Sequence, residues 1–217
     1  MKLAAFDMDG TILEGRLVFT LSERIGLDGK VRTIQGDGKL AAHKKTAMIA
    51  ELFTGLTRKD IESAVESIPL VKNTEQAMST LKSRDYKIGI ISDSYTAAAS
   101  VVASRLDMDF VAANDLVFEE GVATGKVNMP MGWEKIDCFC RLSVCKRYHL
   151  EKHASKFGVQ MDDTLAVGDT RADICMIRHA GFGVAFMPKD DDVKNASKNA
   201  VNTPDMMQVI RLLDATP

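Results

Sequence analysis

The chain has no large excess of charge of one sign, and this excludes several kinds of partner. Its 217 residues include 28 Lys and Arg against 30 Asp and Glu, which gives a formal net charge of -2. No basic stripe is present, so we expect no nucleic acid partner. The apolar runs are far shorter than the roughly 20 residues of a membrane-spanning helix, so we expect no membrane insertion.

Targeting signals, repeats and low-complexity segments are also missing. The N-terminal apolar run stops at Asp7, which predicts that no signal peptide is present. There are only four cysteines, and together with the absence of a targeting signal this predicts a reduced, cytoplasmic protein. A hydrophobic content of 46% is ordinary for a globular chain. The length allows a full core and one modest extra domain.

Five short apolar segments have the composition of strands that are buried on both faces. Helical patterns separate them, and strands that alternate with helices predict an α/β fold with a mainly parallel, Rossmann-like sheet sandwiched by helices. The predicted strands are 3–6, 87–92, 109–114, 164–169 and 183–186. The predicted helices are one from Asn73 or Thr74 through Leu81, one capped by Ser92 to Ser94 and carrying Val101 to Leu106, and those at 146–157 and 171–179.

Residues 15–72 break this alternation, because they carry no strand signal and about three helical patterns. The apolar residues of these patterns are Leu17, Leu21 and Ile25, then Met48 and Leu52, then Ile61, Val65 and Ile68. We expect a small helical cap at 15–72, inserted after the first strand, and an α/β core made of 1–14 and 73–217. A hairpin flap is predicted near 115–130, with Gly121 and Gly125 near its turn.

Two aspartates, Asp7 and Asp9, follow the first predicted strand and precede Gly10 and Thr11. One interpretation is a hairpin, because Asp-Gly is a common turn sequence. A calcium loop of the EF-hand type is excluded, because its glycine stands at the sixth position and Gly10 falls at the fourth. The third interpretation is a catalytic carboxylate pair.

Three further stretches place chemically capable side chains at strand ends or helix starts. Ser92 ends the second core strand, Asp169 ends another, and Asp173 follows at the start of a helix. Lys146 opens the helix before the strand of Asp169. The carboxyl ends of parallel strands meet at one edge of a sheet, so these groups can converge there. Taken singly, the serine and the aspartates could be helix caps and the lysine a surface charge.

In this order the motifs resemble those of the haloacid dehalogenase-like phosphatase superfamily. The family's DxDGT is found at 7–11, its Ser or Thr at Ser92, and its GDxxxD at 168–173. The cap position, the hairpin and the sequence VGDTRADICMIRHAGFGVAF look most like the phosphoserine-phosphatase branch. In that branch the spacing to the last motif selects Lys146 as the motif lysine. Lys152 and Lys156 are then exposed residues of the same helix.

The resemblance implies a Mg2+-dependent phosphatase that works through an aspartyl-phosphate. Asp7 would attack phosphorus, and Asp9 would act as the acid and then the base. Mg2+ would bind the carboxylates of Asp7 and Asp169 and the main-chain carbonyl of Asp9, with Asp173 supporting the metal. The phosphoryl oxygens would be held by Ser92, Lys146 and the amides of Gly10 and Thr11, with Asp93 and Arg16 as further substrate contacts.

The residues that would bind the serine portion of the substrate differ from those of the phosphoserine-phosphatase branch. Arg16 occupies the position of the usual cap Glu, with Glu14 two residues early, and the segment LAAHKKTAMIAELF has no Arg. Lys44 or Lys45 could replace that Arg electrostatically, although Lys lacks the bidentate fork. These lysines, His43 and Arg16 are either contacts for an anionic substrate or a solvated helix face. In the motifs themselves, Asp93-Ser94 replaces Gly-Gly and Ala172 replaces Asn.

Three cysteines, Cys138, Cys140 and Cys145, precede His149 and His153. Three thiols and one His could bind zinc, but the spacing lacks the usual CxxC pairs. The alternative is that they are buried free cysteines.

We therefore predict a phosphomonoesterase that acts on a small phosphorylated metabolite, with O-phosphoserine as the first named candidate. The cap would close over the site and exclude water. Two alternatives stay open, namely a phosphotransferase to an alcohol and a non-catalytic module that binds a phosphorylated ligand. We expect a monomer or a homodimer.

Overall fold

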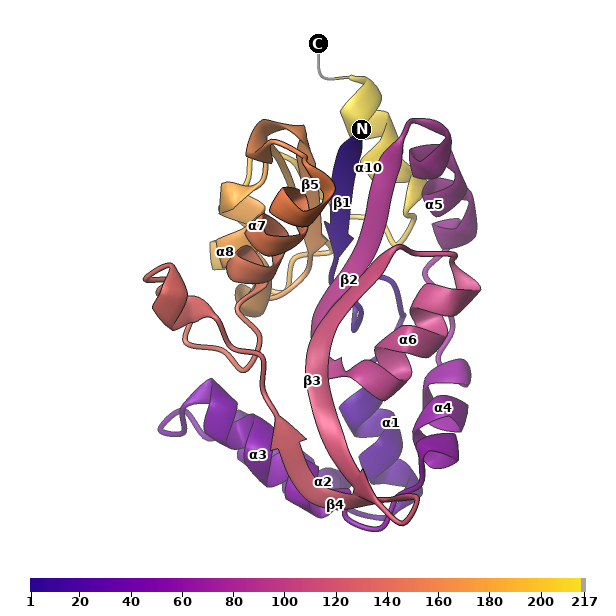
Figure 1. The fold of residues 1–217 in the computed structure, drawn as a ribbon, viewed down its shortest axis with the longest axis vertical. Coiled ribbons are helices and arrows are strands. Elements are labelled where there is room, and N and C mark those ends of the chain that lie inside the picture. The colour runs from indigo at the N-terminus through magenta and orange to yellow at the C-terminus, as the bar shows by residue number, and fades with distance from the viewer. Residues whose placement is uncertain (216–217) are drawn as a thin grey trace.

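A seven-stranded sheet organises the chain in the computed structural model, which describes residues 1–215 (Figure 1). The strand order is β4-β3-β2-β1-β5-β6-β7. All neighbours pair in parallel except β3 and β4, which are antiparallel. The strands are β1 (Lys2–Phe6), β2 (Tyr86–Tyr95), β3 (Phe110–Glu119), β4 (Val122–Asn128), β5 (Thr164–Gly168), β6 (Phe182–Phe186) and β7 (Ala200–Val201).

The sheet is covered on both faces, which explains why its central strands are continuously apolar. In β1, Ala4 and Phe6 pack into one buried cluster while Leu3 and Ala5 pack into another. Alternate residues of a strand point to opposite faces, so both faces of β1 are core. The helices α7 (Lys146–Phe157) and α8 (Ile174–His179) lie on one face, and α5 (Thr74–Ser83) and α6 (Thr96–Arg105) lie on the other (Figure 1). This confirms the predicted α/β class.

The strand β2 runs further than the sequence predicts, and this corrects one local assignment. It extends through Ser92 and Ser94 to Tyr95, so these serines lie in the strand and do not cap α6. The residue before α6 is Tyr95, and its side chain makes no capping hydrogen bond. The strand continues because β3 pairs with it as far as Asn114.

Four helices lie between β1 and α5, where the sequence predicts about three. They are α1 (Leu17–Arg24), α2 (Asp28–Gly36), α3 (Ala42–Leu52) and α4 (Arg58–Glu66). Figure 1 shows them beyond the end of the sheet to which β1 points. The β3–β4 hairpin reaches this helical region, where Gly55 N donates to Ala123 O at 2.8 Å and Ala123 N donates to Leu56 O at 2.8 Å.

The rest of the chain completes the outer layers. A 3-10 turn at Arg171–Asp173 begins the segment predicted as one helix over 171–179, and α8 follows it. None of the described helices is both long and apolar enough to cross a bilayer. The C-terminal helices are α9 (Asp191–Lys194) and α10 (Met207–Asp214), and short 3-10 segments lie at Trp133–Lys135 and Met161–Asp163.

Candidate active site

The first and fifth strands bring three carboxylates to one edge of the sheet. Asp7 follows β1, and its N–H donates to Val167 O of β5 at 2.9 Å. Asp169 follows β5, and Asp173 lies one 3-10 turn later. Carboxylate oxygens of Asp7, Asp169 and Asp173 all lie within 4.8 Å of one another, and all three residues are buried. The structure therefore places these predicted site residues together.

The carboxylate of Asp7 is buried and is paired with an ammonium. Lys146 Nζ lies 2.7 Å from Asp7 Oδ1 as an ion pair, although the angle is not that of a hydrogen bond. Burial raises the pKa of Asp7 well above its usual value, and the nearby Asp173 raises it further, while Lys146 opposes this shift. The lone pairs of Asp7 Oδ1 are therefore not used in a hydrogen bond, and they remain available to a metal ion or to a phosphorus atom.

Lys146 is fully buried at the first position of α7. Its ammonium also lies 2.5 Å from Asp173 Oδ1. Burial alone lowers the pKa of Lys146, but Asp173 and Asp7 outweigh it and raise the pKa above its ordinary value. The lysine therefore stays charged beside Asp7, where it can stabilise negative charge.

Asp173 holds the other groups in place. Its Oδ2 accepts from Thr170 N at 2.8 Å, from Thr170 Oγ1 at 2.9 Å and from Asp169 N at 3.1 Å. With Oδ1 taken by Lys146, both oxygens are engaged. Asp173 acts as a positioning residue here, and direct metal ligation by it stays a prediction.

Asp9 is the second buried carboxylate of the DxD pair. Its Oδ1 accepts from Leu17 N at 3.1 Å, at the start of α1. Burial raises the pKa of Asp9 to about 6, although this hydrogen bond opposes the shift. A carboxyl group with such a pKa can be protonated in part of the molecules near neutral pH, which suits an acid that later acts as a base.

Gly10 and Thr11 fix the turn that follows Asp9. Gly10 has a φ of 87°, and a Cβ at this position would collide with the Asp169 carboxylate. Thr11 Oγ1 donates to Asp169 Oδ1 at 3.4 Å. The amide of Gly10 donates to Leu13 O at 3.0 Å within the turn, so its use for a phosphoryl oxygen stays a prediction.

Ser92 and Asp93 lie at the end of β2, on the same edge of the sheet. Ser92 is fully buried, and its Oγ accepts from Ser94 N at 3.2 Å. The carbonyl of Asp93 accepts from Asn114 Nδ2 at 2.6 Å. Asn114 in turn donates to Ser143 Oγ at 3.0 Å, so the β2 end is tied to the loop before α7.

A cavity of about 150 Å³ opens between this edge and the first three helices, α1, α2 and α3. Arg16 and Lys45 bring positive charge to it, and Arg16 Nε is buried without a hydrogen-bond partner. Of the other predicted contacts, His43 and Lys44 are not among its lining residues. The lining also includes Asp9, Val18, Gln35, Ala42, Thr46, Ile49, Asp93, Ser94 and Tyr95.

The sequence did not predict two residues of the site, one beside a carboxylate and one in the cavity lining. Lys189 Nζ lies 3.6 Å from Asp169 Oδ2, and Lys189 N donates to Asp169 O at 3.0 Å. It follows β6 with no motif around it, so the sequence carried no signal for it. Gln35 was missed with α2, and its backbone carbonyl accepts from Lys45 Nζ at 2.8 Å.

The cluster of three carboxylates is suited to bind a divalent cation. Three buried carboxylates face one buried ammonium, Lys146, and burial also raises the pKa of Asp169 to about 6. Such an excess of negative charge is costly unless a cation or protons offset it. Carboxylate oxygens are the ligands of hard divalent ions. The unsatisfied Oδ1 of Asp7 is one acceptor that such an ion could use.

In sequence and in fold, the chain is similar to proteins named phosphoserine phosphatase. A phosphoserine phosphatase, SerB2, of Mycobacterium tuberculosis is 29% identical over 99% of this chain, which spans 51% of that relative's length. The phosphoserine phosphatase of Methanocaldococcus jannaschii is 26% identical over 98% of this chain and 97% of its own. A solved structure described as a phospho-aspartyl intermediate analogue of phosphoserine phosphatase superposes with a TM-score of 0.83, at 25% identity over 97% of this chain and 98% of that one.

One family model accounts for most of the sequence. It describes haloacid dehalogenase-like hydrolases and matches residues 1–181. The matched span includes β1 with its two aspartates, the end of β2, Lys146 and the loop after β5. The chain belongs to the haloacid dehalogenase-like hydrolase family.

Proposed function

We propose that this chain is a Mg2+-dependent phosphatase that hydrolyses a small phosphomonoester through an aspartyl-phosphate on Asp7. The observation that carries the proposal is the buried Asp7 carboxylate, 2.7 Å from the buried ammonium of Lys146 and beside Asp169. Relatives named phosphoserine phosphatase over nearly the whole chain support the same reaction class. A cytoplasmic location and a monomer or homodimer stay predictions.

The residues account for both halves of the reaction. Asp7 attacks phosphorus, the ester P–O bond breaks, and protonated Asp9 gives its proton to the leaving oxygen. Asp9 then takes a proton from a water that attacks the phosphorus, which releases phosphate and restores the Asp7 carboxylate. Lys146 and Ser92 hold the phosphoryl oxygens during both transfers. The raised pKa of Asp9, about 6, allows it to hold a proton in the first half and accept one in the second.

The carboxylates of Asp7 and Asp169 and the main-chain carbonyl of Asp9 would hold the cation. We propose Mg2+ because the donors are all oxygens and Mg2+ completes its shell with waters and phosphate. When bound, it offsets the repulsion between a carboxylate and a phosphate dianion. Asp173 keeps Lys146 and the 169–170 backbone in place through the bonds described above.

The helices α1–α4 supply the substrate-reading side, and we propose that they form a cap over the site. Arg16 and Lys45 both line the cavity, so the substrate should carry an anionic group besides its phosphate. O-phosphoserine satisfies this through its carboxylate. Asp93, also in the lining, is a candidate partner for the amino group.

Phosphate release from three esters tests the proposal. Phosphoserine is compared with phosphoethanolamine, which lacks the carboxylate, and with 3-phosphoglycerate, which lacks the amine. We expect release that needs Mg2+, stops with EDTA and is abolished in Asp7→Asn, and we expect phosphoethanolamine to be the poorest substrate. An alcohol added to the assay reports transfer, since phosphorylated alcohol would then replace part of the free phosphate. If wild type and Asp7→Asn behave alike on every ester, the chain is not this enzyme.

A further inference from the structure

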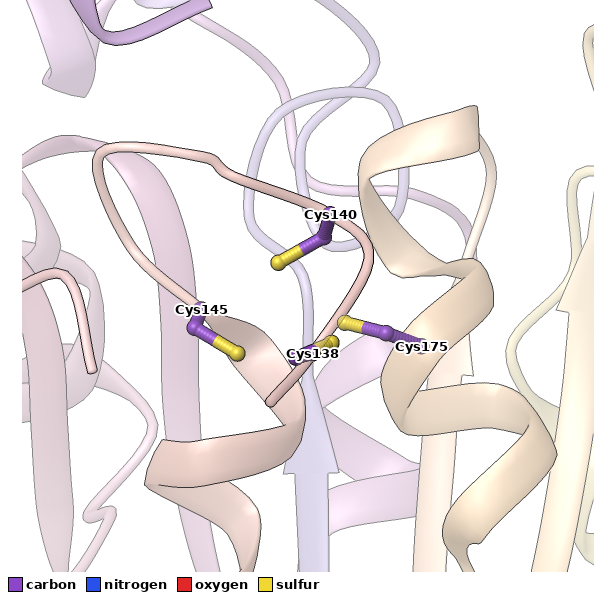
Figure 2. A group of neighbouring side chains, drawn as sticks. All are labelled: Cys138, Cys140, Cys145 and Cys175. Atoms are coloured by element: carbon purple, nitrogen blue, oxygen red, sulfur yellow. The ribbon is translucent and has the colours of Figure 1, made fainter. Parts of the chain in front are cut away.

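All four cysteines of the chain meet at one place, outside the carboxylate site. Cys138, Cys140 and Cys145 come from the loop that leads into α7, and Cys175 comes from the first turn of α8. Their sulfur atoms all lie within 4.8 Å of one another, and Figure 2 shows the side chains reaching toward a shared centre. No disulfide joins them. We call these four residues the cysteine quartet.

The composition of the quartet differs from the sequence expectation. The sequence allowed three thiols and a histidine as one interpretation beside free cysteines, but His149 is not in the group, and its Nε2 is buried without a hydrogen-bond partner. Cys175 takes the fourth place. It lies two residues after the GDxxxD motif, far along the chain from the other three, so the sequence pattern could not associate it with them.

The geometry of the quartet suits one metal ion. In a tetrahedral zinc site the Zn–S bonds are about 2.3 Å, which puts the sulfurs about 3.8 Å apart. The sulfurs here satisfy the 4.8 Å limit for every pair, so one ion at their centre needs only a small contraction. An iron–sulfur cluster places irons and sulfides between its thiolates and needs a wider cage.

Backbone N–H groups at the start of α7 and in the loop before it face the sulfurs of the quartet. The backbone N–H groups of Tyr148 and Arg147, in the first turn of α7, donate to the sulfurs of Cys145 and Cys175, and that of Leu142 donates to Cys140. A helix N-terminus with free N–H groups stabilises negative charge. Cys138, Cys145 and Cys175 are buried beside Trp133, Ile136 and Tyr148, so water is largely excluded.

We propose that the cysteine quartet is a structural zinc site with four thiolate ligands. Binding converts four thiols to thiolates, and their protons pass to solvent. No coordination position is left open, which is the arrangement of a structural site. The zinc would join the loop before α7 to α8, since Cys145 directly precedes Lys146 and Cys175 lies two residues after Asp173. It thereby fixes the two elements whose ion pair, at 2.5 Å, supports the carboxylate site.

Metal analysis of the full chain tests the proposal without relying on activity. The protein is purified under reducing conditions, washed with EDTA to strip the carboxylate site, and analysed for zinc and iron. We expect about one zinc ion per chain. Asp169→Asn should keep it, because that change affects only the carboxylate site. Co2+ in place of zinc should give the strong thiolate-to-metal absorption of tetrahedral sulfur ligation.

Two variants separate loss of the metal from loss of packing. Cys175→Ser should lower the affinity for zinc by more than about tenfold. Val144→Ala, which trims a fully buried neighbour of Cys145, should destabilise the chain and yet keep its zinc. The proposal is overturned by four reactive thiols without zinc, by iron in place of zinc, by a disulfide, or by a zinc affinity of Cys175→Ser, measured by chelator competition, that equals the wild-type affinity.

Discussion

Gly10 matters both for the backbone turn that follows Asp9 and for the position of the Asp169 carboxylate. Its φ of 87° strains any other residue, and a Cβ would press on the carboxylate of Asp169. Gly121 has a φ of 84° but nothing within 4 Å of its would-be Cβ. Gly10→Ala and Gly121→Ala should therefore both lose about 1–2 kcal/mol of stability from strain. Only Gly10→Ala should also displace Asp169 and lose most of its phosphatase activity.

Urea unfolding and phosphate release of the two glycine variants check this prediction. If Gly121→Ala loses activity as severely as Gly10→Ala, strain alone explains the effect and the contact with Asp169 is irrelevant.

His153 gives a stability effect that depends on pH. Its ring stacks on Phe110 at 4.1 Å between centroids, and burial lowers its pKa to about 4. Protonation therefore favours the unfolded chain, where the pKa is about 6.5. The stability from neutral His153 is complete above about pH 6.5 and is lost as the pH falls toward 4.

Replacement of this histidine should reduce acid sensitivity. Between about pH 7.5 and pH 5, wild type should lose about 1 kcal/mol more stability than His153→Gln, once solvent screening of the half-buried ring is counted. Urea unfolding at both pH values measures it. Equal losses in the two proteins would mean that His153 is protonated in the folded state.

Single residues of the site were predictable where a motif marks the end of a strand. Asp7, Asp9 and Asp169 were identified in this way, because parallel strands bring their carboxyl ends to one edge, while Lys146 was selected by the motif spacing of the resembled family. Lys189 and Cys175 were not identified as parts of a site. Their partners are set by how separate segments pack, and a single sequence carries no record of that.

At the scale of elements, the N-terminus of α4 is fixed by reciprocal capping hydrogen bonds. Thr57 Oγ1 accepts from Asp60 N at 3.1 Å, and the Asp60 side chain accepts from Thr57 N at 2.8 Å, which is a capping box. We expect Thr57→Ala to cost about 1 kcal/mol. Thr33→Ala removes a hydroxyl that only donates to Gly29 O within α2, and it should be close to neutral.

Thermal unfolding of Thr57→Ala and Thr33→Ala compares the two sites. An unchanged midpoint for Thr57→Ala would show that packing of α4, and not its cap, fixes where the helix begins.

Two of the elements that the sequence missed have little apolar signal, whereas α10, which was also missed, buries Val209 and Ile210. α2 buries only Val31 and contains Gly29 and Gly36, which are poor helix formers. β7 has two residues and pairs only with β6 at the edge of the sheet. The inner strands were predicted because both of their faces are core, so their apolar runs are uninterrupted.

At the scale of the whole molecule, the cavity lies between the sheet edge and the helices α1, α2 and α3. Arg16→Gln and Lys45→Gln should each raise KM about tenfold or more for a substrate with a second anionic group, while kcat changes less. Lys44→Gln is the matched control, since Lys44 is exposed on the same helix as Lys45 and does not line the cavity. A KM that rises equally in Lys44→Gln would indicate general electrostatic attraction instead of contact.

The central claim is that Asp7 carries the phosphoryl group, and acid quenching during turnover tests it most directly. Protein is mixed with its best ester and Mg2+, quenched in acid, digested and analysed by mass spectrometry. The account predicts a phosphoryl group on the peptide that contains Asp7, and none on that peptide in Asp7→Asn. Turnover with no phosphorylated Asp7, or with the phosphoryl group on another residue, would contradict the account.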